Sequence, residues 1–315
     1  MKFNRIFLIA ATALSVVACN KNKGELRPSE TSPINVTAGL DVDTRAGYDA
    51  ENLPMHFYLT IVQDADNQGS EYNYTEVEMT KGESGRYNAF DADLFWMNDN
   101  HSDVKVNAYT AKGTAFSVLK DQSTEAKLEQ SDLLGAYEGH SDDITFNAND
   151  LYVRFRHLLC KLDVTVAWDE ALAGLAKEVT SVVYKGFGED VVLNRNDATV
   201  TAGENVIDIQ AFLKSTDENK TYVSEAVFAP QTADMAIVIS ARIDGVEKGY
   251  QLNLEPPTDG FVFGNAYTLG VKICGDALLF MATPTLNAWE NGDPLDFSKA
   301  EAIFTFVAST DSPME

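Results

Sequence analysis

Cys19 is the residue whose type and position indicate the clearest chemistry, because it directly follows Val16-Val17-Ala18 at the end of an apolar run. Lys2 and Arg5 precede that run, which extends from Ile6 to Val17. Basic, apolar and small residues in this order are typical of a secretory signal peptide. The run is shorter than the roughly 20 residues that a membrane-spanning helix needs. We therefore predict that residues 1–18 are removed as a signal peptide and that Cys19 becomes the lipidated first residue of the mature chain.

Residue patterns for catalysis or metal binding are largely absent from the sequence. It has no G-x-S-x-G elbow, no phosphate loop and no H-E-x-x-H pair. Segment Asp64–Gly69 imitates the start of a calcium loop, but Thr75 stands where the bidentate acid is expected, so a hairpin loop is favoured. The remaining candidates have no spacing or neighbours suited to catalysis or metal binding: Asp91 and Asp93, Asp142 and Asp143, and the histidines His56, His101, His140 and His157. The sequence thus predicts no enzyme, no metal site and no cofactor.

A group of aromatic residues allows two interpretations. Flat rings match the apolar face of a sugar, which would make a stacking platform, whereas rings in a β-rich chain more often fill the core. The core is the favoured interpretation for this group: Tyr72, Tyr74, Tyr87, Phe90, Phe95 and Trp96.

The net charge limits which partners the chain can have, and the strand patterns indicate the state of its cysteines. The formal net charge is -24, and loss of Lys2 and Arg5 with the signal peptide would make it -26, which disfavours nucleic acid as a partner. The acidic residues are spread along the chain, which favours a solvated exterior over an acidic binding tail. Strand patterns place Cys160 and Cys274 on opposite kinds of face, so we expect two free thiols rather than a disulfide.

Hydrophobic residues alternate with a period of two along most of the chain, which predicts strands. Residues 19–33 are polar with two prolines and are expected to be a flexible tether. A first strand is expected over residues 34–42, and helical periodicity is confined to residues 121–134 and 171–177. Short strands separated by Gly, Asn and Asp favour antiparallel β-sandwiches. The fold class is therefore predicted to be all-β.

Two domains are expected from the chain length of 315 residues. Between Leu151 and Trp168 the apolar positions change parity near His157, as expected of a strand that serves two cores. We therefore place an N-terminal β-sandwich at residues 34–149 and a C-terminal β-sandwich at residues 150–300. Residues 301–315 form a candidate donor strand and tail, since the apolar run Ala302–Ala308 follows an already complete domain.

Short motifs distributed over nearly the whole mature chain resemble the fimbrillin family of pilus subunits from Bacteroidales, the FimA/Mfa-like proteins. Their order and spacing behind the lipidation site carry the resemblance, and no single motif is decisive. The motifs are Thr44-Arg45-Ala46, Ser131-Asp132-Leu133-Leu134-Gly135-Ala136, Phe155-Arg156-His157-Leu158-Leu159-Cys160-Lys161-Leu162, Phe228-Ala229-Pro230-Gln231-Thr232, Phe263-Gly264-Asn265-Ala266-Tyr267-Thr268-Leu269 and Ala288-Trp289.

The resemblance implies two transthyretin-like β-sandwich domains in tandem and assembly by strand exchange. It also implies a lipoprotein precursor at the outer membrane, cut after its first strand by an Arg- or Lys-specific protease. In this sequence the bond would be Arg45-Ala46. The donor strand would come from another copy or a paralogous subunit, with Ile303, Phe304, Phe306 and Val307 as its apolar residues.

Three functions follow as expectations. A structural pilin of a cell-surface, adhesive fimbrium is the first, and a tip or base accessory subunit of the same fimbria is a variant of it. A surface glycan-binding lipoprotein with the aromatic group as its site is the alternative. A glycoside hydrolase is the least favoured, because no acid-base pair was found.

Overall fold

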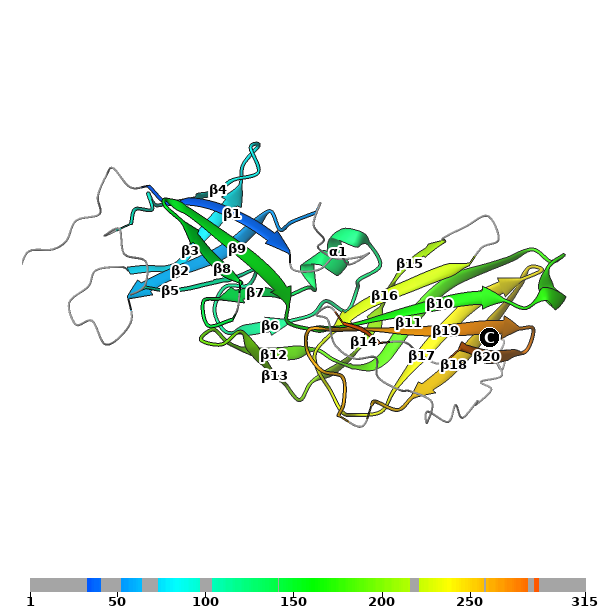
Figure 1. Ribbon diagram of the computed structural model, residues 1–315. Helices are drawn as coiled ribbons and strands as arrows, with labels where there is room; N and C mark the ends of the chain where they lie inside the picture. Colours follow the sequence, from blue (N-terminus) through cyan, green and yellow to red (C-terminus); the bar gives the residue numbers. More distant parts are fainter. Residues whose placement is uncertain are drawn as a thin grey trace, which may run out of the picture.

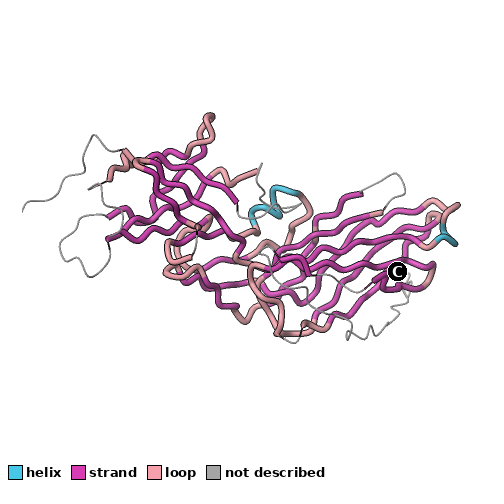
Figure 2. Tube along the Cα trace, viewed as in Figure 1, coloured by secondary structure: helices cyan, strands magenta, loops and turns pink. Residues whose placement is uncertain are grey.

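The computed structural model describes residues 33–40, 52–63, 73–96, 104–140, 142–215, 221–257, 259–282 and 286–288. Strands make up most of this part of the chain (Figure 2). They lie in two bodies arranged end to end (Figure 1). The helical elements within the described ranges are α1 (Glu125–Gln130) and a 3₁₀ turn (Glu170–Leu172), and no helix there is long and apolar enough to cross a membrane. The all-β prediction is confirmed.

The first body is a sheet that closes on itself. Its order is β1-β4-β3-β2-β5-β7-β9-β8, and a further pairing of β1 with β9 closes a ring of seven strands within the described ranges, with β8 outside it. The strands are β1 (Asn35–Leu40), β2 (His56–Gln63), β3 (Asn73–Lys81), β4 (Tyr87–Ala89), β5 (Val104–Tyr109), β7 (Leu134–Tyr137), β8 (Ile144–Asn147) and β9 (Asp150–His157).

Alternation along each strand builds the core of this barrel. Phe57, Leu59 and Ile61 of β2 point inward, as do Val104 and Val106 of β5, because side chains two residues apart share a face. The intervening side chains of these strands point outward. The barrel core is therefore a single apolar cluster enclosed by one ring of strands.

The second body consists of two sheets that share one core. One sheet has the order β15-β16-β10-β19-β20, with β21 also on β19, and the other has the order β14-β11-β17-β18. The strands are β10 (Cys160–Trp168), β11 (Lys177–Gly188), β14 (Val206–Gln210), β15 (Phe212–Ser215), β16 (Tyr222–Phe228), β17 (Met235–Ile243), β18 (Val246–Leu254), β19 (Asn265–Cys274), β20 (Ala277–Ala282) and β21 (Leu286–Ala288).

The turn between β17 and β18 shows how local sequence sets register here. Asp244 and Gly245 both have positive φ, 50° and 83°, the conformation that a two-residue hairpin requires. Ile243 pairs with Val246 directly across the turn, and the pairing continues to Met235 and Leu254. The Asp-Gly pair therefore fixes the antiparallel register of β17 and β18.

A three-stranded sheet and α1 join the two bodies. β6 (Ala115–Ser117) pairs with β12 (Asp190–Asn194), which pairs with β13 (Thr199–Ala202). Leu128 of α1 packs in the second core, although α1 precedes most of the second body in sequence. Thr124 caps α1 by accepting a hydrogen bond from the backbone of Lys127. The segment between β5 and β7 therefore belongs structurally to the second body.

The predicted change of face near His157 corresponds to a change of core. Leu151, Val153 and Phe155 of β9 pack in the barrel, whereas Leu162 and Val164 of β10 pack in the second body. The sequence boundary at about residue 150 stands before β9, and the change of sheet follows His157.

The N-terminal half differs from the sandwich of two separate sheets that the sequence predicted. Its outer strands meet, since β1 pairs with both β4 and β9, so the sheet forms a closed ring. Parity patterns predict faces but do not report which edges join, which is why the sequence did not reveal the closure.

Candidate functional site

β1 is the strand that completes the barrel. It pairs in parallel with β9 from Asn35 opposite Asp150 to Leu40 opposite Phe155. On its other edge it pairs antiparallel with β4, with Val36 opposite Tyr87. Figure 1 shows it lying along β9 at the outer end of the molecule. Within the predicted first strand, residues 34–42, the described part up to Leu40 thus occupies a slot in the first body rather than lying outside its sheets.

Backbone and side-chain hydrogen bonds fix the start of β1. The Ile34 amide donates to Leu94 O and the Asn35 amide donates to Asn149 O, each at 2.9 Å. The Asn35 side chain also donates to Asp150 Oδ1 at 3.0 Å. The end of β1 is held differently, because β4 is only three residues long and the described pairing with it involves Val36 alone. The strand is therefore bound on both edges at its start and by β9 at its end.

Apolar side chains of β1 fill the barrel core. Val36 is 1% exposed and Ile34 is 8% exposed, while Ala38 and Leu40 are half-buried against the same cluster. The rings beside this slot are tightly packed: the centroids of Phe57 and Tyr87 lie 4.8 Å apart and those of Phe57 and Phe155 lie 5.2 Å apart. Removal of β1 would expose apolar surface and unpaired backbone groups of β9 together.

Gly39 is the one position of β1 where a side chain would collide. A Cβ atom there would lie 2.0 Å from the Tyr152 hydroxyl oxygen. Tyr152 lies directly on the neighbouring strand, so its side chain crosses over β1 at the glycine. Any other strand in this slot must carry a glycine there, shift its register, or displace the Tyr152 side chain.

Most of the site residues predicted from the sequence lie outside the described residues. These are Cys19, the Arg45-Ala46 bond, and the donor residues Ile303, Phe304, Phe306 and Val307. The calcium-like segment Asp64–Gly69 and His101 lie outside as well. Of the residues involved in the predicted exchange, the structure describes the first strand, which is paired with β9 and β4 as β1.

The aromatic group does not form one exposed platform. Tyr87 and Trp96 are buried in the barrel core, at 3% and 1% exposure, whereas Phe90 is 70% exposed. The core interpretation therefore holds for Tyr87 and Trp96. Tyr72 lies outside the described residues.

Asp143 is a buried charged residue whose role sequence reasoning missed. Its side chain accepts a hydrogen bond from Arg156 Nε at 3.0 Å and pairs with His140 Nδ1 at 2.8 Å. Burial raises the pKa of Asp143, and the Arg156 and His140 charges oppose that rise. The cluster ties the loop after β7 to β9. Within the described residues no group of His, Cys, Asp and Glu is suited to hold a metal ion.

A second buried charge cluster lies across β10, β15 and β16. Lys161 Nζ lies 3.0 Å from Glu225 Oε2 and 3.1 Å from Asp163 Oδ1, and Lys214 Nζ lies 2.9 Å from Glu225 Oε1. Burial raises the pKa of Asp163 to about 6, with Lys161 opposing. Burial lowers the pKa of Lys161, but the carboxylates of Asp163 and Glu225 raise it more. Two cations balance two carboxylates, so the cluster is an ion-pair network rather than an acid-base site.

Free cysteines were also predicted correctly. Cys160 is buried, and burial raises the pKa of its thiol well above the ordinary value. Cys274 is half-buried, and the two do not form a disulfide.

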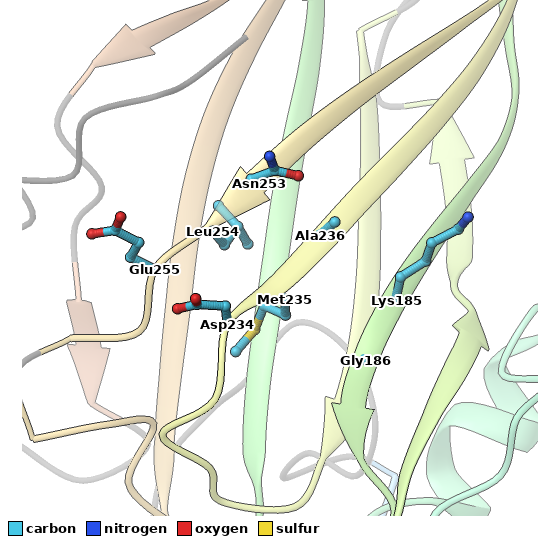
Figure 3. Close-up of a pocket in the computed structure, with 8 residues that line it drawn as sticks. All are labelled: Lys185, Gly186, Asp234, Met235, Ala236, Asn253, Leu254 and Glu255. Carbon is cyan, nitrogen blue, oxygen red and sulfur yellow. The ribbon is translucent and has the colours of Figure 1, made fainter. Parts of the chain in front are cut away.

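An open depression of about 460 Å³ lies on the second body (Figure 3). Lys185, Ala236 and Asn253 are cross-strand neighbours on β11, β17 and β18, and the small Ala236 side chain leaves space between the two longer ones. Asp234 and Glu255 lie at its other side. No nucleophile with an adjacent base lines it, so it has no arrangement suited to catalysis.

Comparison with known proteins places this architecture in a family. The model of the family described as Fimbrillin-like matches residues 44–289. The chain therefore belongs to the Fimbrillin-like family, the fimbrial and adhesion proteins of Bacteroidales. Because the family is non-enzymatic, the prediction that the chain is not an enzyme is confirmed. No curated protein matches the sequence.

Solved structures agree at the level of the fold. A candidate cell adhesion protein from Bacteroides ovatus is similar with a TM-score of 0.58 and 15% identity, covering 83% of this chain and 99% of that chain. A candidate cell adhesion protein from Bacteroides uniformis is similar with a TM-score of 0.54 and 17% identity, covering 82% of this chain and 99% of that chain. At such identities the likeness supports the fold alone.

Proposed function

We propose that the chain is a structural subunit of a surface fimbrium, made as a lipoprotein precursor and assembled by strand exchange. The signal peptide is removed, Cys19 carries the lipid that anchors the precursor at the outer membrane, and an Arg- or Lys-specific protease cuts the Arg45-Ala46 bond. β1 then leaves the barrel, and residues Ala302–Ala308 of a neighbouring copy or paralogous subunit fill its slot.

The observation that carries this proposal is the position of β1. It completes a closed ring with a buried Val36, yet it is the first strand of the described residues, so one cut after it separates it from all the other described strands. The family match begins at residue 44, next to the proposed cut and after β1. The matched range, residues 44–289, thus lies almost wholly in the part of the chain that would remain after the cut.

After β1 has left, a slot filled by another strand is lower in free energy than an empty slot. An empty slot leaves the inner-edge backbone groups of β9 unpaired, and an added strand satisfies them while covering the apolar core. The donor residues Ile303, Phe304, Phe306 and Val307 would each contribute about 1.5 to 3 kcal/mol if fully buried. Donor and acceptor belong to different regions, so the contact is head-to-tail and extends into a filament.

The finer fold assignment belongs to the same proposal. Both bodies derive from transthyretin-like sandwiches, the first at residues 34–149 and the second at residues 150–300. The two sheets around one core in the second body support this. In the first body, β1 joins the two outer strands β4 and β9, and its removal would reopen the ring.

Treatment of the purified precursor with an Arg-specific protease tests the proposal. We expect a mature fragment that begins at Ala46 and forms ladders on a gel under mild denaturation. The Arg45→Ala variant should stay monomeric, and a chain lacking residues 301–315 should be cut without forming ladders. Ladders from either variant would rule out the corresponding role, the cut bond or the donor strand.

A further inference from the structure

A cleft of about 410 Å³ lies where the barrel meets the three-stranded sheet. Its floor is the outer face of β5 and β7, and its wall is the turn between β12 and β13. The polar residues that line it are Lys105, Asn107, Glu138, Arg195 and Asn196, beside the ring of Tyr137. It is separate from the β1 slot, because Lys105 and Asn107 alternate with the inward-pointing Val104, Val106 and Ala108 of the barrel core.

Arg195 is held rigidly at one side of this cleft. Its Nη1 atom donates to Gly113 O at 2.9 Å and to Ala111 O at 3.2 Å, and lies 3.1 Å from Glu76 Oε1. Its guanidinium carbon lies 4.5 Å from the centre of the Tyr109 ring. The Tyr109 hydroxyl in turn donates to Arg195 O at 2.9 Å. The position of the guanidinium is therefore fixed before any ligand arrives.

Glu76 adds local strain to this arrangement. Its φ is 49°, in the left-handed region that residues other than glycine rarely adopt, at the irregular register between β2 and β3. The Thr60 hydroxyl accepts a hydrogen bond from the Glu76 amide at 3.0 Å and stabilises that conformation. The strained backbone aims the carboxylate at Arg195 and at the Gly113 amide, which donates to it at 2.6 Å. Such strain is often found at binding sites.

Two buried polar atoms that belong to residues lining the cleft lack a hydrogen-bond partner within the described structure. These atoms are Asn107 Oδ1, an acceptor, and Arg195 Nη2, a donor. An unpaired buried polar atom costs about 1 to 3 kcal/mol, and a native structure keeps few of them without a reason. A ligand that both donates and accepts hydrogen bonds would satisfy both atoms.

Hydroxyl groups have that dual character, and a sugar ring carries several of them side by side. The amide, carboxylate and cationic side chains that line the cleft beside the Tyr137 ring supply matching partners. The volume lies within the range of about 300 to 1,000 Å³ that is typical of small-molecule sites. It is too small for a folded protein partner.

We propose that this cleft binds one residue of a saccharide, whose neighbouring hydroxyl groups pair with Asn107 Oδ1 and Arg195 Nη2. The site adds a ligand contact to the fimbrial role and does not depend on strand exchange. It lies outside the slot, so it is present in the uncut precursor and in the assembled subunit alike.

Binding of the uncut chain to an array of neutral and uronic-acid oligosaccharides tests this site. We expect retention on at least one saccharide and at least a ten-fold weaker binding of that saccharide by the Asn107→Ala variant. Asn253→Ala is the matched control, because Asn253 lies on the depression of the second body and its loss should leave binding unchanged. Asn196→Ala, an exposed change in the turn wall, should weaken binding without affecting folding.

Melting temperatures of all three variants show whether each one is folded. No retention of the wild-type chain on any saccharide would overturn the proposal. Equal binding by the wild type and by folded Asn107→Ala and Asn196→Ala would overturn it too, as would an equal loss in Asn253→Ala. Because the chain stays uncut, failure of the fimbrial proposal would not alter these outcomes.

Discussion

The barrel owes its closure to β1, the short first strand of the described residues, whereas the second body is closed by long strands and by segments from both halves of the sequence. β1 pairs with β9 over six residues and with β4 at one described position. β10 lies between β16 and β19 over most of its length, and β11 pairs with β17 from Lys177 to Lys185. Loss of one terminal strand therefore opens the first body and leaves the second intact.

Polar groups mark the same difference. The inside of the second body is fastened by Gln122, whose side chain donates to Val227 O at 2.8 Å and accepts from the Val227 amide at 2.9 Å. The Gln122 side chain thus forms the hydrogen bonds at the edge of β16 where β15 no longer pairs with it. In the barrel, the strand β1 rather than a buried side chain pairs with the edge of β9. One short strand thus closes the barrel, whereas a buried side chain helps to close the second body.

The largest expected effect comes from placing a charge on the buried face of β1, the strand that closes the barrel. Val36→Asp puts a carboxylate at a position 1% exposed, without a cationic partner, which should destabilise the barrel by about 3 to 5 kcal/mol. Hydrogen-exchange mass spectrometry should show β2 and β5 exchanging faster, while β17 stays protected. Thr37→Asp, on the other face of β1, is the control and should have little effect. Equal loss of protection in both bodies would show that they are not closed independently.

Gln122→Ala is the reciprocal test in the second body. It leaves the buried amide and carbonyl of Val227 unpaired, at about 1 to 3 kcal/mol for each group. Urea denaturation should show lower stability of the second body, with β2 and β5 protected as in the wild type. Gln251→Ala, on a half-exposed face of β18, should change little. A loss confined to the barrel would contradict the assignment of residues 111–133 to the second body.

Asp163 makes the stability of the second body depend on pH. Its folded pKa of about 6 exceeds the ordinary 3.8, so the folded state binds more protons between these values. The contribution is therefore full below about pH 4 and is lost as pH rises through 6, by at most about 3 kcal/mol. In Asp163→Asn, the free energy of unfolding measured in urea should vary less with pH across this window. In the exposed Asp259→Asn, it should vary as in the wild type. An unchanged slope in Asp163→Asn would show that another group titrates.

The smallest effect is expected at the crossing of Tyr152 over β1. Gly39→Ala places a Cβ against the Tyr152 hydroxyl oxygen. It should lower the stability of the barrel with β1 in place by about 1 to 3 kcal/mol, the usual range for overpacking. Tyr152→Phe removes that oxygen, so the double variant should recover part of the loss in a thermal melt. Additive losses would mean that the collision is relieved elsewhere.

Strand positions followed closely from the sequence because alternation is a local property. The first strand was expected over residues 34–42 and β1 lies within that range, and the helical periodicity over residues 121–134 includes α1. Short strands such as β4 and β6 were missed, since three residues show no period. The closure of the ring, the Gln122 bridge and the cluster at Lys161 depend on residues far apart in sequence, which no local pattern reports.

The candidate site was predicted in outline only. A first strand was expected over residues 34–42, and β1 lies within that range, but the contact of Gly39 with Tyr152 was not predicted, because it requires the parallel register with β9. Asn107 and Arg195 were not singled out either, since their common feature is a missing partner rather than a motif.

Binding of a synthetic peptide with the sequence of residues 301–309 tests the central claim most directly. The peptide should bind the chain that begins at Ala46, once the detached N-terminal fragment has been removed, and should restore exchange protection along β9. It should not bind the uncut precursor, whose slot holds β1. Binding to both forms alike, or to neither while β9 stays protected without β1, would contradict the account.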